Sequence, residues 1–363
     1  MRIAVACGGT GGHVFPGLAV ARALRQRGHA VTLWLSGRTV EQASVSGWDG
    51  PVERVHARGF QSGGLRVAGT VKSLLSAFLA CRRRMKRDRP DAVLGMGSYA
   101  SVGPVAAARS LGIPALVHEA NVVPGRAVAF LARLGAKVGL TFAATRRYLP
   151  RAETELTGLP VRDDLAGTFE DGAFGGGADV PGAFTVLVMG GSQGARRLNE
   201  VGAGAVKSLR GRGVPVRVIH LCGPNQGPEA IEAVYRSAGV PALVFGFLRE
   251  MGKAYRAADL AVCRAGASSC MELAAFGVPA VLVPLPTAVR DHQTANAREM
   301  ESAGAAVCVP EAGLTVDGLA ALVDDLRCDA ARLVGMKAAM LRVAQPDAAG
   351  RLADMVERRA ARE

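Results

Sequence analysis

The sequence has few aromatic residues and none of the cysteine patterns of a zinc or disulfide-rich protein. Aromatic residues make up 5% of the 363 residues, which leaves few rings on which single-stranded bases could stack. The seven cysteines are scattered and include no C-x-x-C pair, which argues against a disulfide framework and favours a reducing compartment. No apolar stretch approaches the roughly 20 residues of a membrane-spanning helix.

A signal segment and an excess of acidic residues are also missing. Gly8 and Gly9 interrupt the chain before an apolar signal core could form, so we expect an intracellular protein. Lysine and arginine total 44 against 31 aspartate and glutamate residues, a formal net charge of +13. Such a charge indicates an anionic partner, which could be nucleic acid, a membrane surface or a phosphorylated substrate.

The most informative stretch is the glycine-rich segment CGGTGGHVFP at residues 7–16. It follows an apolar run at residues 2–6 that predicts a buried strand, and it precedes residues 17–27, which predict a helix ended by Gly28. A glycine loop between a strand and a helix offers backbone N–H groups to an anionic or polar ligand.

This loop matches neither of two well-known nucleotide-binding patterns. The third glycine of the dinucleotide fingerprint would fall at Val14, and Gly17 is not followed by the Lys-Ser/Thr of a P-loop. The unusual feature is a histidine in the middle of the loop, His13. It is either a turn residue without chemistry or a side chain presented over a pocket at the carboxyl end of a parallel strand.

The pattern of the chain predicts two similarly built α/β domains. Short β-type runs alternate with alanine-rich segments, which is typical of parallel βαβ units. Residues 158–162, followed by a glycine-rich stretch at residues 172–182, indicate a domain connection. After it, a strand at residues 184–189 and a second glycine loop at residues 190–194 restart the pattern. We expect each glycine loop to face a shared cleft. The remaining predicted strands are residues 31–35, 92–94, 114–117, 138–140, 260–263 and 280–283.

Residues 71–87 combine an apolar stripe at helical spacing with a run of basic residues. The stripe could pack in the core and leave a solvated basic end. Alternatively, the helix could dip its apolar face into an anionic membrane surface while its arginines meet lipid phosphates. The residues concerned are Val71, Leu74, Leu75, Phe78 and Leu79 in the stripe, and Arg82, Arg83 and Arg84 in the run.

Five segments occur in one order: residues 8–16, 118–121, 191–194, 264–272 and 291–297. In this combination the whole chain resembles the MurG family of bacterial peptidoglycan N-acetylglucosaminyltransferases. The resemblance implies the GT-B fold, an α/β architecture of two Rossmann-like parallel-sheet domains facing a central cleft. It also implies inverting transfer of N-acetylglucosamine from UDP-N-acetylglucosamine to the muramyl 4-hydroxyl of lipid I, giving lipid II, with no metal and no cofactor.

The same resemblance implies that different parts of the chain have different binding roles. Residues 1–161 would bind the acceptor and the membrane, residues 162–345 would bind the UDP-sugar donor, and residues 346–363 would form a helix packing back on the first domain. The enzyme would be peripheral, on the cytoplasmic face of the plasma (inner) membrane, with an anionic membrane surface and no nucleic acid as partner. The alternative is another GT-B enzyme that uses a UDP-sugar, either a lipid glycosyltransferase or a nucleotide-sugar epimerase.

The resemblance also implies roles for individual donor-site residues. Arg162 and Ser192 would bind the diphosphate, Glu272 would accept hydrogen bonds from the ribose hydroxyls, and the backbone of Leu248 would read the uracil edge. The other expected donor contacts are Ala267, Ser268, Ser269, His292 and Gln293.

For the acceptor, the resemblance implies contacts in the first domain at Thr10, Gly11, Gly12, Tyr99 and Asn121. His13 would be the general base, because a neutral imidazole can take the proton of the attacking hydroxyl near pH 7. A competing role for His13 is binding of the acceptor diphosphate. Ser98 stands where the family usually has glycine. The membrane contact would be the stripe and arginine run between Val71 and Arg84.

Overall fold

The computed structural model describes residues 1–361 except 10, 38–40, 42–44, 46, 56–63, 162–172, 174–181 and 192–193. At residues 64–68 and 71 it describes the backbone alone. The chain forms two compact units, Met1–Arg162 together with Gln345–Glu363, and Asp163–Ala344.

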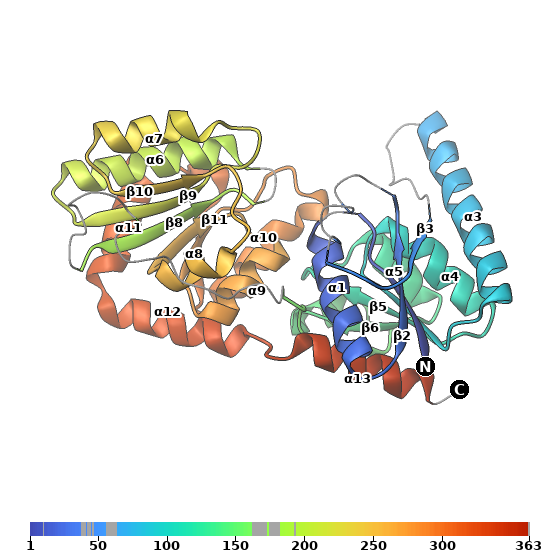
Figure 1. The fold of residues 1–363 in the computed structure, drawn as a ribbon. Coiled ribbons are helices and arrows are strands. Elements are labelled where there is room, and N and C mark those ends of the chain that lie inside the picture. Colours follow the sequence, from blue (N-terminus) through green and yellow to red (C-terminus); the bar gives the residue numbers. More distant parts are fainter. Residues whose placement is uncertain are drawn as a thin grey trace. The chain divides into compact units, whose positions relative to one another are not determined.

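The first unit is built on a seven-stranded, all-parallel sheet in the order β3-β2-β1-β4-β5-β6-β7 (Figure 1). The strand order reverses between β1 and β4, which is the switch point at which such sheets bind ligands. The strands predicted in this half of the chain are confirmed, with ends shifted by one or two residues. The seven strands are β1 (Arg2–Ala6), β2 (Ala30–Leu35), β3 (Val52–Arg54), β4 (Ala92–Gly95), β5 (Ala115–Glu119), β6 (Lys137–Leu140) and β7 (Thr154–Leu156), of which the sequence pattern does not predict β3 and β7.

Helices cover both faces of this sheet, which is why its strands are continuous apolar runs. In β1, Ala4 and Ala6 face the core that underlies α3, α4 and α5, whereas Ile3 and Val5 face the core under α1 and α13. Cys7, just after the strand, belongs to this second core. These helices are α1 (Gly11–Gln26), α3 (Gly64–Arg87), α4 (Val102–Ser110), α5 (Arg126–Arg133) and α13 (Ala348–Ala360).

The last helix, α13, lies alongside α1 (Figure 1). Leu352 and Val356 are fully buried under the sheet. At the rim of this contact, Arg27 forms ion pairs with Asp354 at 2.5 Å and with Glu357 at 2.9 Å. The final segment of the chain therefore completes the core of the first unit.

The second unit repeats the plan with a six-stranded, all-parallel sheet in the order β10-β9-β8-β11-β12-β13. One core lies between this sheet and helices α6, α7 and α11, and Figure 1 shows α8 and α9 on the opposite side. The prediction of two parallel-sheet α/β domains is therefore confirmed. The strands are β8 (Phe184–Met189), β9 (Val216–Leu221), β10 (Ala242–Phe245), β11 (Leu260–Cys263), β12 (Ala280–Leu282) and β13 (Ala306–Cys308).

The helices of the second unit alternate with its strands as far as β13, after which α11 and α12 follow one another. The helices are α6 (Arg196–Gly211), α7 (Pro228–Ser237), α8 (Met251–Ala257), α9 (Ala267–Phe276), α10 (His292–Ser302), α11 (Val316–Cys328) and α12 (Ala330–Val343). Short 3-10 helices occur at η1 (Tyr99–Ser101), η2 (Ala143–Tyr148), η3 (Val289–Asp291) and η4 (Glu311–Gly313).

In the part of the chain that the structure describes, none of the helices combines the length and the apolar character needed to cross a membrane.

The expectation that a loop extends to Pro16 is wrong, because α1 already begins at Gly11. Glycine and proline are poor helix formers, so local helix propensity does not predict the first turns of α1. Packing decides instead: Val14 and Pro16 are buried, and a Cβ added at Gly17 would lie 2.3 Å from the Cβ of Cys7. Gly17 therefore permits the close helix–strand contact that a fingerprint glycine usually provides.

Replacing Gly17 with alanine should destabilise the first unit, because the new methyl group would overlap Cys7. We expect Gly17→Ala to lower the free energy of unfolding by about 1–3 kcal/mol. The fluorescence of Trp34 and Trp48, the two tryptophans of the chain, reports this unit during denaturant unfolding.

The matched control is Gly69→Ala in α3, where an added Cβ meets nothing within 4 Å. Because alanine is the better helix former, this change should raise stability by roughly 0.5–1 kcal/mol. Equal midpoints for Gly17→Ala and the unmodified protein would contradict the packing role of Gly17.

Candidate functional site

Three loops meet at the carboxyl edge of the first sheet. Strands β1, β4 and β5 are neighbours and parallel, so the segments that follow them emerge at one edge. The Ser98 hydroxyl in the β4 loop donates a hydrogen bond to the carbonyl of Gly8 in the β1 loop. A Cβ added at Gly97 would lie 2.8 Å from the carbonyl oxygen of His118. The structure thus brings together the segments that carry Gly11, Gly12, His13, Tyr99 and Asn121.

His13 lies in the first turn of α1 and not in the middle of a loop. Its Nδ1 lies 2.7 Å from the carbonyl oxygen of Met96. Because a carbonyl only accepts hydrogen bonds, Nδ1 carries the proton, and in the neutral ring Nε2 is then the basic nitrogen. The backbone at the end of β4 therefore selects the tautomer that a general base requires.

A buried glutamate that the sequence analysis did not single out holds the first glycine loop. Glu41 is 1% exposed. Its Oε1 accepts a hydrogen bond from the N–H of Gly9 at 2.6 Å, and its Oε2 accepts one from the N–H of Gly37 at 2.7 Å. The N–H of Gly9 is thus engaged by a carboxylate, whereas the N-terminal amides of a helix such as α1 are suited to receive an anion.

The last two residues of β5, His118 and Glu119, are also buried. Burial lowers the pKa of His118 to about 4, so its ring is neutral at pH 7, and its Nε2 lies 2.8 Å from the carbonyl oxygen of Gly158. Burial raises the pKa of Glu119 to about 7, although hydrogen bonds from the N–H groups of Asn121 and Gly125 oppose the shift. The Nδ2 of Asn121 also donates to Glu119 at 3.2 Å, so Glu119 orients this predicted acceptor residue.

Tyr99 is half-buried in η1, one residue after Ser98, whose side chain accepts a hydrogen bond from the N–H of Ala100. Tyr99 thus lies at the carboxyl end of β4, on the same edge of the sheet as His13 and Asn121. Thr10, another predicted acceptor contact, lies outside the described residues.

The second sheet presents the same kind of edge. A Cβ added at Gly190 would lie 2.3 Å from the backbone nitrogen of Ala195, and one at Gly194 would lie 2.4 Å from the carbonyl oxygen of Cys222. Gly194 also has a φ of +74°. Only glycine therefore fits at these two positions of the loop after β8. The predicted diphosphate ligands Ser192 and Arg162 lie outside the described part of the chain.

Helix α9 begins beside this loop, because β8 and β11 are paired neighbours. Its N-cap is Gly266 in extended conformation, and Ala267, Ser268 and Ser269 form its first turn. The N–H groups of a first turn have no acceptor within the helix, and they carry the positive end of the helix dipole. This turn is suited to an anionic ligand.

Glu272 follows on the same helix and is 8% exposed. Its Oε2 accepts a hydrogen bond from the hydroxyl of Tyr255 at 2.6 Å. Sequence reasoning missed Tyr255, since no spacing rule links a tyrosine on α8 to a carboxylate on α9. Leu248 is half-exposed after β10, the edge strand on the far side of β9.

Two buried side chains hold the loops of this edge together. Arg264 donates hydrogen bonds to the carbonyl oxygens of Val283 and Pro284 at 3.2 and 3.1 Å. Asn296, on α10, donates to the carbonyl oxygen of Ala265 at 3.1 Å. The segments after β11 and β12 are thereby fixed to each other.

The predicted sugar contacts lie at the start of α10. Gln293 accepts a hydrogen bond from the N–H of Leu285 at 3.0 Å, and Nδ1 of His292 donates to a backbone carbonyl at 2.8 Å. Arg290 and Asp291 just before them have φ values of 57° and 53°, which cost energy for residues other than glycine. Such strain is frequently stored at functional sites.

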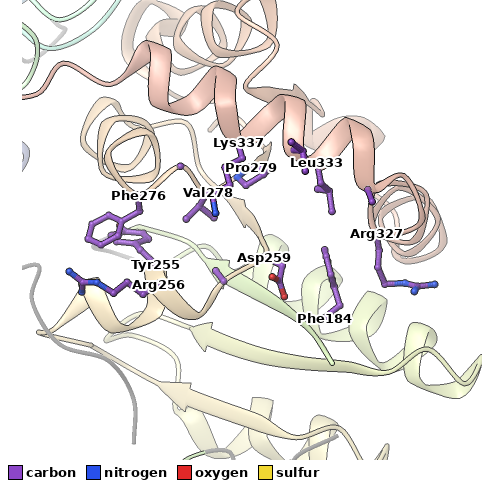
Figure 2. Close-up of a pocket in the computed structure, with 14 residues that line it drawn as sticks. Phe184, Tyr255, Arg256, Asp259, Phe276, Val278, Pro279, Arg327, Leu333 and Lys337 are labelled. Atoms are coloured by element: carbon purple, nitrogen blue, oxygen red, sulfur yellow. The ribbon is translucent and has the colours of Figure 1, made fainter. Parts of the chain in front are cut away.

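A pocket of about 490 Å³ lies at the opposite edge of the second sheet (Figure 2). Phe184, Asp259 and Pro279 line it at or just before the starts of β8, β11 and β12. It is therefore separate from the predicted donor loops, which follow the ends of these strands.

Across the described residues, no group of three His, Cys, Asp or Glu side chains is arranged to hold a metal ion.

The structure divides the apolar stripe of α3 between two faces. Phe78 packs partly buried against the core of the first unit, and Leu74 is half-buried. In contrast, Leu75 and Leu79 are 55% and 41% exposed. The side chain of Val71 lies outside the described residues.

The arginine run is divided as well. Nε of Arg82 donates to the hydroxyl of Ser110 at 3.2 Å, and Arg84 forms an ion pair with Glu53 at 2.7 Å. Arg83 is exposed. Two of the three predicted arginines therefore make contacts within the first unit.

Comparison with known proteins agrees with this architecture. Residues 3–140 match the N-terminal domain of glycosyltransferase family 28, and residues 185–352 match its C-terminal domain. The chain is 40% identical to the UDP-N-acetylglucosamine--N-acetylmuramyl-(pentapeptide) pyrophosphoryl-undecaprenol N-acetylglucosamine transferase of Aeromonas hydrophila, over 98% of this chain and 96% of that one. The enzyme of the same name from Halorhodospira halophila is 42% identical over 98% and 97% of the two chains.

A solved structure extends the likeness to three dimensions. The crystal structure of Acinetobacter baumannii MurG is 34% identical, covers 98% of this chain and 99% of its own, and gives a TM-score of 0.80. The chain therefore belongs to glycosyltransferase family 28 and, within it, to the MurG family.

Proposed function

We propose that this protein transfers N-acetylglucosamine from UDP-N-acetylglucosamine to the 4-hydroxyl of the muramyl sugar of lipid I, which forms lipid II. The observation that carries the proposal is the 40% identity to a transferase of that name over 98% of the chain. In this proposal the two sheet edges would supply the groups that such a transfer needs.

The second unit would bind the donor. The first turn of α9, with Ala267, Ser268 and Ser269, offers N–H groups to the diphosphate, and Ser192 and Arg162 would add to them. Negative charge grows on the departing UDP in the transition state, and fixed N–H donors stabilise it without reorganising. The ribose hydroxyls would be bound by Glu272, the uracil by the backbone of Leu248, and the sugar hydroxyls by His292 and Gln293.

The first unit would bind the acceptor and supply the base. The muramyl 4-hydroxyl attacks the anomeric carbon, the bond from that carbon to the phosphate oxygen breaks, and its electron pair leaves with UDP. Attack from the opposite side inverts the anomeric centre. Nε2 of His13 would take the hydroxyl proton. The N-terminal amides of α1 at Gly11 and Gly12 would bind the lipid diphosphate, with Thr10, Tyr99 and Asn121 around the acceptor.

The direct test is transfer of labelled N-acetylglucosamine from its UDP donor to a lipid I analogue in EDTA. We expect product with UDP-N-acetylglucosamine and little with UDP-glucose as the control donor. Binding of UDP without transfer would move the acceptor to another lipid or sugar. A failure to bind UDP at all would refute the donor site.

Removing the imidazole should test the role of His13. If it is the base, His13→Ala lowers kcat by roughly 100- to 10,000-fold and leaves UDP affinity unchanged. The pH–rate profile of the variant should lose the limb on which protonation of the base lowers the rate. If kcat is kept and the KM for the lipid acceptor rises, His13 binds the acceptor diphosphate instead.

We also propose that the first unit docks on the cytoplasmic face of the plasma membrane through the outer face of α3, defined as Lys72, Leu75, Leu79, Arg83 and Lys86. These residues follow one another at helical spacing of three or four, and all are exposed. The two leucines would enter the acyl boundary, and the three cations would meet anionic lipid phosphates.

Removing the three cations should weaken vesicle binding. Each basic residue near an anionic surface contributes about 1 kcal/mol, so Lys72→Ser, Arg83→Ser and Lys86→Ser together should lower affinity on the order of 100-fold at low salt. Sedimentation with phosphatidylglycerol vesicles measures this change.

The control removes three exposed cations from the second unit, Lys207, Arg212 and Arg236. This variant has the same net charge but keeps the outer face of α3. If both variants bind anionic vesicles equally, the docking face on α3 is wrong.

A further inference from the structure

Glu272 is held by a hydroxyl from a neighbouring helix. Tyr255, on α8, is 2% exposed and Glu272 is 8% exposed. The Tyr255 hydroxyl donates to Oε2 of Glu272 at 2.6 Å. Hydrogen bonds from a hydroxyl to a carboxylate are short and about twice as strong as neutral ones.

The tyrosine ring is itself fixed by aromatic packing. Its centroid lies 5.3 Å from that of Phe276, at an interplanar angle of 36°, and the guanidinium of Arg256 lies 5.0 Å from the Phe276 ring centroid. Figure 2 shows Tyr255 and Phe276 against each other at one end of the pocket. Tyr255 therefore presents its hydroxyl from a rigid support.

We propose that Tyr255 is a positioning residue for donor binding, which holds the Glu272 carboxylate in the orientation that receives the ribose hydroxyls. This inference rests on the proposed contact between Glu272 and the ribose. A glutamate side chain has three rotatable bonds, and ordering it on ligand binding costs entropy. The Tyr255 hydroxyl removes that cost in advance, and a carboxylate has acceptor capacity for several donors at once.

A purely structural role for Tyr255 makes a different prediction. Tyr255→Phe keeps the ring and its contact with Phe276, and it removes only the hydroxyl. If the ring alone matters, recognition of the ribose is unchanged. If the hydroxyl orients Glu272, the loss is confined to ligands that carry ribose hydroxyls.

The experiment compares UDP with 2′,3′-dideoxy-UDP by calorimetry on the full chain. We expect Tyr255→Phe to weaken UDP binding about 5- to 10-fold, the equivalent of one hydrogen bond, and to leave dideoxy-UDP binding unchanged. In a Glu272→Gln background, removal of the Tyr255 hydroxyl should have little further effect, because the two changes break one interaction. The donor KM should rise by the same factor while kcat is retained.

The matched control is Tyr235→Phe, which removes another buried hydroxyl of the same unit, bonded to Nδ1 of His220 at 2.7 Å. It should lose stability in a similar way but keep UDP affinity. Even if Tyr255→Phe melts at a lower temperature than this control, UDP and dideoxy-UDP are both measured on the same variant. The ratio of their dissociation constants therefore isolates the contribution of the ribose hydroxyls.

The outcomes separate this inference from the function on which it rests. The role of Tyr255 alone is overturned if Tyr255→Phe weakens the binding of UDP and of dideoxy-UDP equally. It is also overturned if Tyr255→Phe leaves UDP binding unchanged while Glu272→Gln weakens it. Unchanged UDP affinity in Glu272→Gln overturns the ribose contact as well. Weakening of UDP alone supports the positioning role.

Discussion

The site depends above all on the parallel direction of every strand in the two sheets. Parallel strands end at one edge, so each loop after a strand joins the loops of its neighbours. In the first unit this brings the start of α1 beside the loops after β4 and β5, and in the second it brings the start of α9 beside the glycine loop after β8. Two helix N-termini, with their outward N–H groups, thus stand at the two switch points.

Hydrogen bonds from outside each loop orient the side chains at these edges. The Met96 carbonyl sets the tautomer of His13, Glu119 turns the amide of Asn121, and the Tyr255 hydroxyl holds Glu272. Each is a hydrogen bond between partly or fully buried groups, where an unmatched polar atom would be costly. These side chains are therefore held in place by the protein itself, and such preorganisation is the condition for electrostatic stabilisation.

The predicted chemistry is divided between the two units. The first carries a histidine with a basic nitrogen and a helix with an exposed apolar and cationic face, which suits a lipid-linked acceptor. The second carries a glycine loop, a helix N-terminus and a carboxylate on one edge, which suits a nucleoside diphosphate sugar. Neither edge alone carries both the proposed base and the proposed donor-binding groups, so the proposed reaction draws on both units.

The sequence by itself determined the two parallel sheets, most of their inner strands and the segments that carry the candidate site, because alternating apolar runs and glycine loops are local signals. It did not predict β3, β7, β9, β10 and β13. Tertiary structure decided where α1 begins, since the contact of Gly17 with Cys7 overrides the poor helix propensity of glycine and proline. It also decided which side of α3 faces the core, with Phe78 partly buried against the core and Leu75 and Leu79 exposed. The roles of Glu41 and Tyr255 arise from contacts between residues distant in sequence, and no periodicity or spacing encodes such contacts.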